Sequence, residues 1–146
     1  MFYIGIIWLV ALDLITKYLA KINLQETKNL VGDFLYLRYT ENIGIAFSIP
    51  VTGLFLKILT IAIICVLFWY YFTEEKKKQN TLINLSFCLI FAWAFWNGYE
   101  RVFNGTVIDF IGVQYFSVFN LADVFITIWV ILYISTFIFL NKPNNA

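Results

Sequence analysis

The stretch FNLADVFITIWVILYISTFIFL, residues 119–140, decides the fold of this chain. Residues 126–140 carry no charged side chain, and a helix needs about 20 mostly apolar residues to cross a lipid bilayer. The stretch therefore predicts a membrane-spanning helix. Its carboxylate, Asp123, lies at the start of the apolar run, where an ionised group near lipid is costly and usually has a function.

The composition of the chain agrees with a membrane environment. Of its 146 residues, 62% are hydrophobic and only 13% are charged, whereas soluble domains carry about 25% charged residues. The net charge of +1 argues against nucleic acid as a partner, because nucleic-acid binding requires a basic patch. The absence of histidine removes Ser-His and Cys-His catalysis and the commonest metal ligand. Cys65 and Cys88 lie within apolar runs at no metal-ligand spacing, so we expect neither a metal site nor a cofactor.

Three further apolar runs precede this stretch, so we expect four transmembrane helices. The first run lacks the basic start of a signal peptide and contains Asp13 and Lys17, so we expect it to remain as a helix. We predict an all-α membrane protein with a small extracytoplasmic β-sheet, formed by a single membrane-embedded domain over residues 1–146. The expected elements are helices at about 2–22, 52–73, 81–99 and 120–141, an outer β region at about 30–50 and an outer loop at about 102–119.

The residues between the apolar runs give the expected orientation. Three consecutive lysines, at 76–78, lie between the second and third helices, and Lys142 lies in the C-terminal tail. Because basic residues in short loops favour the cytoplasm, we predict that both termini and the lysine loop are cytoplasmic. The segments 22–52 and 97–120 then lie outside, although they also hold the basic residues Lys28, Arg38 and Arg101. The alternating, aromatic FLYLRYT at 34–40 predicts a strand in the first of these segments.

Polar residues that need an explanation gather at one expected depth, near the outer membrane interface. They are Asp13, Lys17, Asn97, Glu100, Arg101, Asp109, Asn120 and Asp123. Each has an ordinary structural interpretation. Asp123 can cap a helix that begins at Asn120, and Asp109 can be a turn residue. Asp13 and Lys17 can form an ion pair one helical turn apart, and the polar residues from 97 to 101 can simply end the third helix.

Asp109 and Asp123 suggest a chemical function when they are taken together. They are too distant in sequence to meet on one continuous helix, where each residue adds about 1.5 Å, but a loop followed by a helix start can bring them together. Two carboxylates at close range do not both ionise easily, so they share a proton. This is the chemistry of aspartic proteases, in which one carboxylate activates water while the protonated one polarises the scissile carbonyl.

Four short motifs, in this order, resemble those of the lipoprotein signal peptidases, the signal peptidase II family. They are DLITK at 13–17, NIGIAF at 42–47, VIDF at 107–110 and FNLAD at 119–123. The resemblance runs nearly from end to end, and it implies four transmembrane helices with cytoplasmic termini and a small extracytoplasmic sheet. It also implies that Asp109 and Asp123 are the catalytic aspartates.

One segment departs from the pattern of this family. The third helix of the family usually ends in G-G-A-x-G-N-x-x-D-R, and the matching stretch here is AWAFWNGYER at 92–101. Asn97 and Arg101 are kept, whereas Glu100 replaces an aspartate. Glycines are replaced by Ala92, Trp93 and Trp96. Because glycines permit close helix contact, we expect the two tryptophans to displace a neighbour or to fill space that lipid occupies in relatives. The sequence leaves their effect on activity or inhibitor binding open.

The resemblance implies an intramembrane aspartyl endopeptidase of the bacterial cytoplasmic membrane, with its active site near the outer face. Its substrate would be a prolipoprotein whose lipobox cysteine carries diacylglycerol, and activated water would cut just before that cysteine. The expected partners are lipidated prolipoproteins and membrane lipid, and the enzyme is expected to be a monomer. Residues expected to bind substrate or support the aspartates are Asn42, Gly44, Asn97, Arg101 and Asn120, and those expected to brace the structure are Asp13, Lys17 and Glu100.

Two functions from other classes remain open at the level of the sequence. A small transporter or channel would line a path through the membrane with polar residues, but the inner half of each expected helix is nearly free of charge. A catalytically impaired relative would bind lipidated peptides without cutting them. The replaced glycines permit this second alternative, and the two retained aspartates argue against it.

Overall fold

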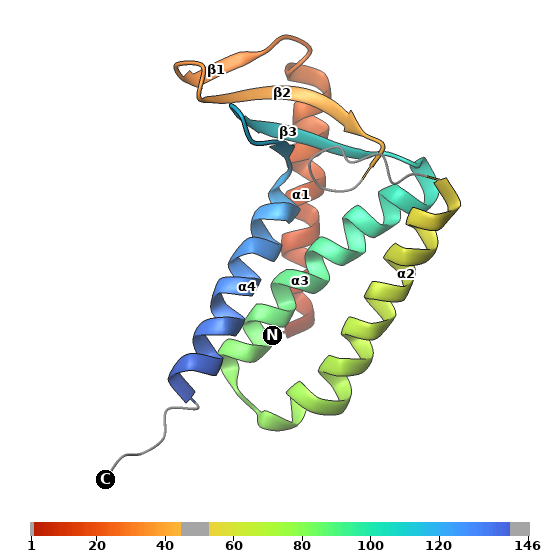
Figure 1. Cartoon of the computed structure of the whole chain (residues 1–146), viewed down its shortest axis with the longest axis vertical. Coiled ribbons are helices and arrows are strands. Elements are labelled where there is room, and N and C mark those ends of the chain that lie inside the picture. Colours follow the sequence, from red (N-terminus) through yellow and green to blue (C-terminus); the bar gives the residue numbers. More distant parts are fainter. Residues whose placement is uncertain (1, 45–52, 141–146) are drawn as a thin grey trace.

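Figure 1 shows the computed structural model of the chain, which describes residues 2–44 and 53–140. Over these residues it consists of four long helices and a four-stranded antiparallel sheet that lies across one end of the helices. The helices are α1 (Phe2–Asn23), α2 (Gly53–Tyr70), α3 (Thr81–Tyr99) and α4 (Leu121–Leu140). The strands are β1 (Lys28–Val31), β2 (Leu35–Asn42), β3 (Val107–Val113) and β4 (Val118–Phe119).

Some of the predicted features lie outside the described residues. They are the end of the outer β region and of the NIGIAF motif, from residue 45 onward, and the expected outermost residues of two helices, at 52 and 141. The segment expected as an outer loop contributes β3 and β4 to the sheet. It does so because the backbone groups of β3 pair with those of β2, which gives an extended segment partners for its hydrogen bonds.

Two of the helices continue beyond their regular α-helical part. α2 runs on through a π-helical turn (Tyr71–Glu75) and a 3₁₀ turn (Lys76–Lys78), and α3 runs on through a π-helical turn (Glu100–Asn104). Gly105 ends the latter with a φ of 78°, a left-handed conformation that glycine adopts without steric cost. This reversal directs the chain from α3 back across the helix ends into β3.

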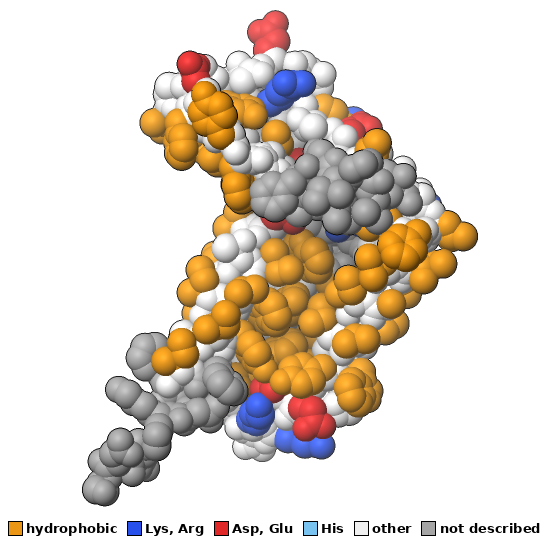
Figure 2. All heavy atoms as spheres, viewed as in Figure 1, with side chains coloured by type: hydrophobic (Ala, Val, Ile, Leu, Met, Phe, Trp, Pro, Cys, Tyr) orange, Lys and Arg blue, Asp and Glu red, His pale blue; other side chains and the backbone are white. Residues whose placement is uncertain are grey.

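Among the described residues, three helical segments are long and apolar enough to cross a membrane: Tyr3–Asn23, Gly53–Lys78 and Thr81–Asn104. By the same criteria of length and apolar composition, α4 counts as a shorter apolar helix, over Leu121–Thr136. Hydrophobic side chains cover much of the outward helix surface in Figure 2, as expected for a surface that contacts lipid. The protein is therefore a membrane protein, and the fourth span stays a prediction.

The core of the helical region forms around α3. In the most apolar part of the segment that contains α3, 61% of the residues are buried inside the protein. The corresponding share for the segment that contains α2 is 6%. Phe68 of α2 stacks on Phe91 of α3 with ring centroids 4.3 Å apart, and Tyr133 of α4 meets Phe87 of α3 edge-on at 5.7 Å. These aromatic contacts connect α2 and α4 to α3, while the other faces of α2 remain apolar and exposed.

The sheet has the strand order β1-β2-β3-β4, with antiparallel neighbours throughout. In the β2–β3 pair Thr40 lies opposite Asp109 and Asn42 lies opposite Val107, after an irregularity between Leu37 and Thr40. A β-bulge produces this kind of shift and redirects the side chains that follow it. The pairing places Asn42 next to Asp109, although the two are distant in sequence.

Candidate active site

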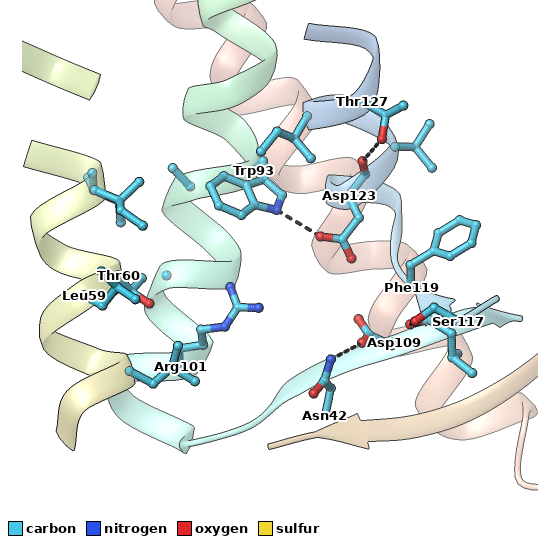
Figure 3. A pocket seen from close by; sticks show the side chains of 18 of the residues that line it. Asn42, Leu59, Thr60, Trp93, Arg101, Asp109, Ser117, Phe119, Asp123 and Thr127 are labelled. Atoms are coloured by element: carbon cyan, nitrogen blue, oxygen red, sulfur yellow. Dashed lines mark hydrogen bonds between the residues drawn. The ribbon is translucent and has the colours of Figure 1, made fainter. Parts of the chain in front are cut away.

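A cavity of about 650 Å³ lies between α2, α3, α4 and the strands β2, β3 and β4, and Figure 3 shows the side chains that line it. Its walls are mostly apolar, with side chains such as Leu59 and Ile63 from α2 and Val124 from α4. Asp109 from β3 and Asp123 from α4 both line the cavity, and their carboxyl groups point toward each other in Figure 3. The structure therefore brings the two predicted aspartates to one place.

Asp123 is held by the first turn of its own helix. The backbone N–H of Asn120 donates to Oδ2 of Asp123 at 3.1 Å, and the backbone N–H of Asp123 donates to Oδ1 of Asn120 at 3.0 Å. This reciprocal pair is a capping box, in which each side chain satisfies a backbone donor at the helix start. The helix-cap interpretation of Asp123 is thus correct, and it is compatible with a position in the cavity.

Asp109 accepts hydrogen bonds on both carboxylate oxygens. The amide of Asn42 donates to Oδ2 at 3.0 Å, and the amide of Asn120 donates to Oδ1 at 2.7 Å. Burial, together with the negative charge of Asp123, raises the pKa of Asp109 to about 6, although the two amides and Lys17 act in the opposite direction. Asp109 is consequently suited to carry a proton at mildly acidic pH.

Two asparagines connect the two carboxylates. The amide of Asn97 donates to Oδ1 of Asp123 at 3.3 Å and to Oδ1 of Asn120 at 3.4 Å. The amide of Asn120 donates back to Oδ1 of Asn97 at 3.2 Å, as well as to Asp109. Both asparagine side chains are fully buried, so each is fixed in one orientation by partners on several elements.

A buried ionic cluster lies behind the asparagines. Nζ of Lys17 donates to Oδ1 of Asn97 at 2.5 Å and pairs with Glu100 at 2.6 Å and with Asp13 at 2.9 Å. Asp13 in turn accepts the backbone N–H of Ala122 at 3.0 Å. Lys17 retains only 2% of its surface exposed, so it connects α1 to the ends of α3 and α4 through charges that water does not screen.

Gly44 and Arg101 differ in their relation to the aspartates. The backbone N–H of Gly44 donates to Oδ1 of Asn42 at 2.9 Å, which leaves the amide of Asn42 directed at Asp109. Arg101 lines the cavity with its guanidinium directed into it. It forms no ion pair with a described residue, and its buried Nε has no hydrogen-bond partner among them.

The two tryptophans of the departing segment have different environments. Trp93 lines the cavity, and its indole N–H donates to Oδ1 of Asp123 at 2.9 Å. Trp96 stacks on Tyr99 with ring centroids 5.2 Å apart and lies in a groove against α1. The sequence indicated that these residues fill space, and it missed the hydrogen bond of Trp93. The available signal was chemical, since a partly buried indole N–H usually finds an acceptor.

Close helix contact of the kind that glycine permits occurs elsewhere in the structure. A Cβ atom on Gly98 would lie 2.7 Å from Cδ1 of Ile64, where α3 meets α2. A Cβ atom on Gly5 would lie 3.0 Å from Sγ of Cys88, where α1 meets α3. Glycines at these positions let the helices approach, even though Trp93 and Trp96 replace the glycines expected nearby.

The arrangement as a whole can perform acid–base chemistry on a water molecule. It presents two neighbouring carboxylates, one of them with a raised pKa, at the polar end of an apolar cavity. Within the described ranges no group of three or more histidine, cysteine, aspartate or glutamate side chains could hold a metal ion.

Two solved structures of bacterial membrane enzymes share this fold. One has a TM-score of 0.83 and 26% sequence identity, and the match covers 99% of this chain and 93% of the other. The second has a TM-score of 0.79 and 30% identity, over 98% of this chain and 94% of the other. The helices, the sheet and the carboxylate-lined cavity thus define a membrane enzyme.

The sequence model of signal peptidase (SPase) II matches residues 5–139. The lipoprotein signal peptidase of Caldicellulosiruptor bescii is 38% identical over 92% of this chain and 87% of its own length. Those of Chlorobium phaeobacteroides and Fusobacterium nucleatum are each 33% identical, over 88% and 94% of this chain. The chain therefore belongs to the signal peptidase II family, a family of proteases, and the resemblance seen in the four motifs is confirmed.

Proposed function

We propose that this protein is an intramembrane aspartyl endopeptidase that removes the signal peptide from diacylglyceryl-modified prolipoproteins and cuts just before the lipidated cysteine. The observation that carries the proposal is the pairing of Asp109 and Asp123 on one cavity, bridged by the side chains of Asn97 and Asn120. The substrate class is supported by the relatives, which are lipoprotein signal peptidases.

In the proposed mechanism the two aspartates have different roles. Asp109, whose pKa is raised to about 6, donates a hydrogen bond to the oxygen of the scissile carbonyl. Asp123 accepts a proton from a water molecule as the oxygen of that water bonds to the carbonyl carbon. The proton on Asp123 then passes to the leaving amine as the C–N bond breaks. Asp109 retains its proton when the carbonyl re-forms, so both carboxyl groups return to their starting states.

The apolar part of the cavity supports a lipid-bearing substrate. Side chains from α2 and α4, among them Leu59, Ile63 and Val124, form walls that the diacylglyceryl group would contact. Arg101 is the proposed polar contact, because its guanidinium faces the cavity and its Nε lacks a partner among the described residues. From the side of the sheet, the amide of Asn42 donates a hydrogen bond to Asp109, and the backbone N–H of Gly44 donates one to Asn42.

The proposed orientation places four spans in the bacterial cytoplasmic membrane, with both termini in the cytoplasm and the aspartates near the outer face. The lysine-bearing turn at Lys76–Lys78 supports it, because this turn lies at the opposite end of the helices from the sheet. A single chain supplies both aspartates and their bridging residues, so the proposed active form is a monomer.

The proposal is tested by cleavage of a prolipoprotein with and without its diacylglyceryl group. We expect the purified protein to convert the lipidated precursor to a smaller band on a gel and to leave the unlipidated one intact. Mass spectrometry should locate the new N-terminus at the lipidated cysteine. Equal cleavage of both precursors would contradict the substrate class, and binding of the lipidated precursor without any cleavage would favour a catalytically impaired relative.

The proposed proton on Asp109 gives the reaction a pH dependence. The carboxyl group is mostly protonated below its pKa of about 6 and mostly ionised above it. Because the mechanism needs that proton, kcat/KM should fall as the pH rises above about 6, approaching a tenfold loss per pH unit. Initial rates at low substrate concentration, measured from about pH 5 to pH 8, check this. A kcat/KM that increases throughout that range would contradict the role of Asp109 as the proton donor.

A further inference from the structure

Trp93 donates a hydrogen bond to Asp123, one of the two proposed catalytic aspartates. Its indole Nε1 lies 2.9 Å from Oδ1 of Asp123, and Figure 3 shows the ring at the edge of the cavity with this N–H directed at the carboxylate. Of the five tryptophans in the chain, Trp96 and Trp129 stack on tyrosines away from the aspartates. The indole is also a cavity wall, so one side chain combines a donor with an apolar surface.

The two oxygens of Asp123 are held in different ways. Oδ2 accepts the backbone N–H of Asn120, which belongs to the capping box. Oδ1 accepts the indole of Trp93 at 2.9 Å and the amide of Asn97 at the longer distance of 3.3 Å. Without the indole, Oδ1 would keep only the longer contact with Asn97. The rotation of the carboxyl group about its χ2 angle would then be fixed mainly by the hydrogen bond to Oδ2.

We propose that Trp93 is a positioning residue for Asp123, an inference that rests on the proposed function: its indole N–H orients the carboxylate that activates water, and its ring bounds the substrate cavity. An indole N–H can donate but cannot accept, so Oδ1 of Asp123 is the acceptor in this contact. The contact thereby holds the carboxylate of Asp123 in one orientation for its proposed step with water.

Other charged groups surround Asp123 and remain in place when Trp93 is changed. Asp109 approaches from β3, Asp13 and Lys17 from α1, and Glu100 and Arg101 from the turn that follows α3. A substitution of Trp93 therefore removes one neutral donor and alters no formal charge.

The test compares Trp93→Phe with Trp96→Phe, a matched change one helical turn along the same helix. Phenylalanine keeps most of the ring and removes the N–H. We expect Trp93→Phe to lower kcat on the lipidated precursor on the order of 10-fold, as when the partner that orients a catalytic group is lost, with KM nearly unchanged. Trp93→Ala, which also removes the wall, should raise KM as well. Trp96→Phe should leave both constants within about twofold of the wild type.

A second measurement does not depend on cleavage. In protein labelled with ¹⁵N-tryptophan, the indole N–H signal that disappears in Trp93→Phe is assigned to Trp93. We expect this signal to shift toward the position of a free indole in Asp123→Ala, while the other indole signals stay in place. An unmoved Trp93 signal would overturn the contact itself. A wild-type kcat in Trp93→Phe, or an equal loss in Trp96→Phe, would overturn the positioning role. Failure of the wild-type protein to cleave lipidated precursor would instead overturn the proposed function, and the NMR result would stand.

Discussion

Asp109→Asn and Asp123→Asn are each expected to abolish cleavage of diacylglyceryl-modified prolipoprotein, with kcat at least about 10³-fold lower. Asparagine has nearly the same shape as aspartate but can neither take a proton from water nor hold an acidic proton. In the proposed mechanism Asp109 donates a hydrogen bond to the scissile carbonyl and Asp123 takes the proton from water. Neither aspartate can perform the step of the other. The measurement is the gel-shift assay of precursor cleavage, carried to long times and high enzyme concentrations.

Asp33→Asn is the matched control for these substitutions. Asp33 is exposed in the turn between β1 and β2, where its carboxylate accepts a hydrogen bond from Asn29. This control should cleave at the wild-type rate. The temperature of thermal unfolding of Asp109→Asn and Asp123→Asn should stay close to that of the wild type, which separates lost chemistry from lost structure. Wild-type cleavage by either Asp109→Asn or Asp123→Asn would show that the assignment of the aspartates is wrong.

Lys17→Met is expected to lower the free energy of unfolding by about 3–5 kcal/mol, the usual effect of breaking a buried ion pair. Methionine has a similar length but carries no charge. Its introduction leaves Asp13 and Glu100 as buried carboxylates without their cation, and it removes the donor to Asn97. The loss should be visible as a lower unfolding temperature in detergent, together with lower activity, because Asn97 is no longer held.

The cause of that loss can be separated from the loss of side-chain packing. Lys28→Met, on exposed β1, is the control and should change stability by less than about 0.5 kcal/mol. Adding Asp13→Asn and Glu100→Gln to Lys17→Met removes the uncompensated charges and should restore part of the stability. A single Lys17→Met variant as stable as the wild type would show that the cluster is not under this electrostatic constraint.

The parts of the structure that follow from chain chemistry alone were predictable. Runs of apolar residues predict helices in lipid whatever their partners are, and the i,i+4 spacing of Asp13 and Lys17 predicts the ion pair that the structure contains. The helix cap at Asn120 depends only on the residues of one turn, and the structure contains it as well. These features are local, so a single sequence determines them.

Other parts depend on how distant segments are aligned. The hydrogen bond from Asn42 to Asp109 requires the β2–β3 register and the irregularity that precedes it. The reach of Lys17 to Asn97 and Glu100, and the indole contact of Trp93 with Asp123, depend on the rotation of α3 about its own axis. Periodicity indicates which residues share a face, but it does not indicate which atom on another element that face meets.

Because the capping box holds Asp123 in the first turn of α4, the proposed catalytic activity depends on that turn remaining folded. Helix ends open with much lower free energies than whole proteins do, and each opening here would release Oδ2 of Asp123 from the backbone N–H of Asn120. Activity should therefore decline on heating before the helices separate. Hydrogen exchange at the amides of residues 121–123 would then follow the same temperature dependence as the loss of turnover.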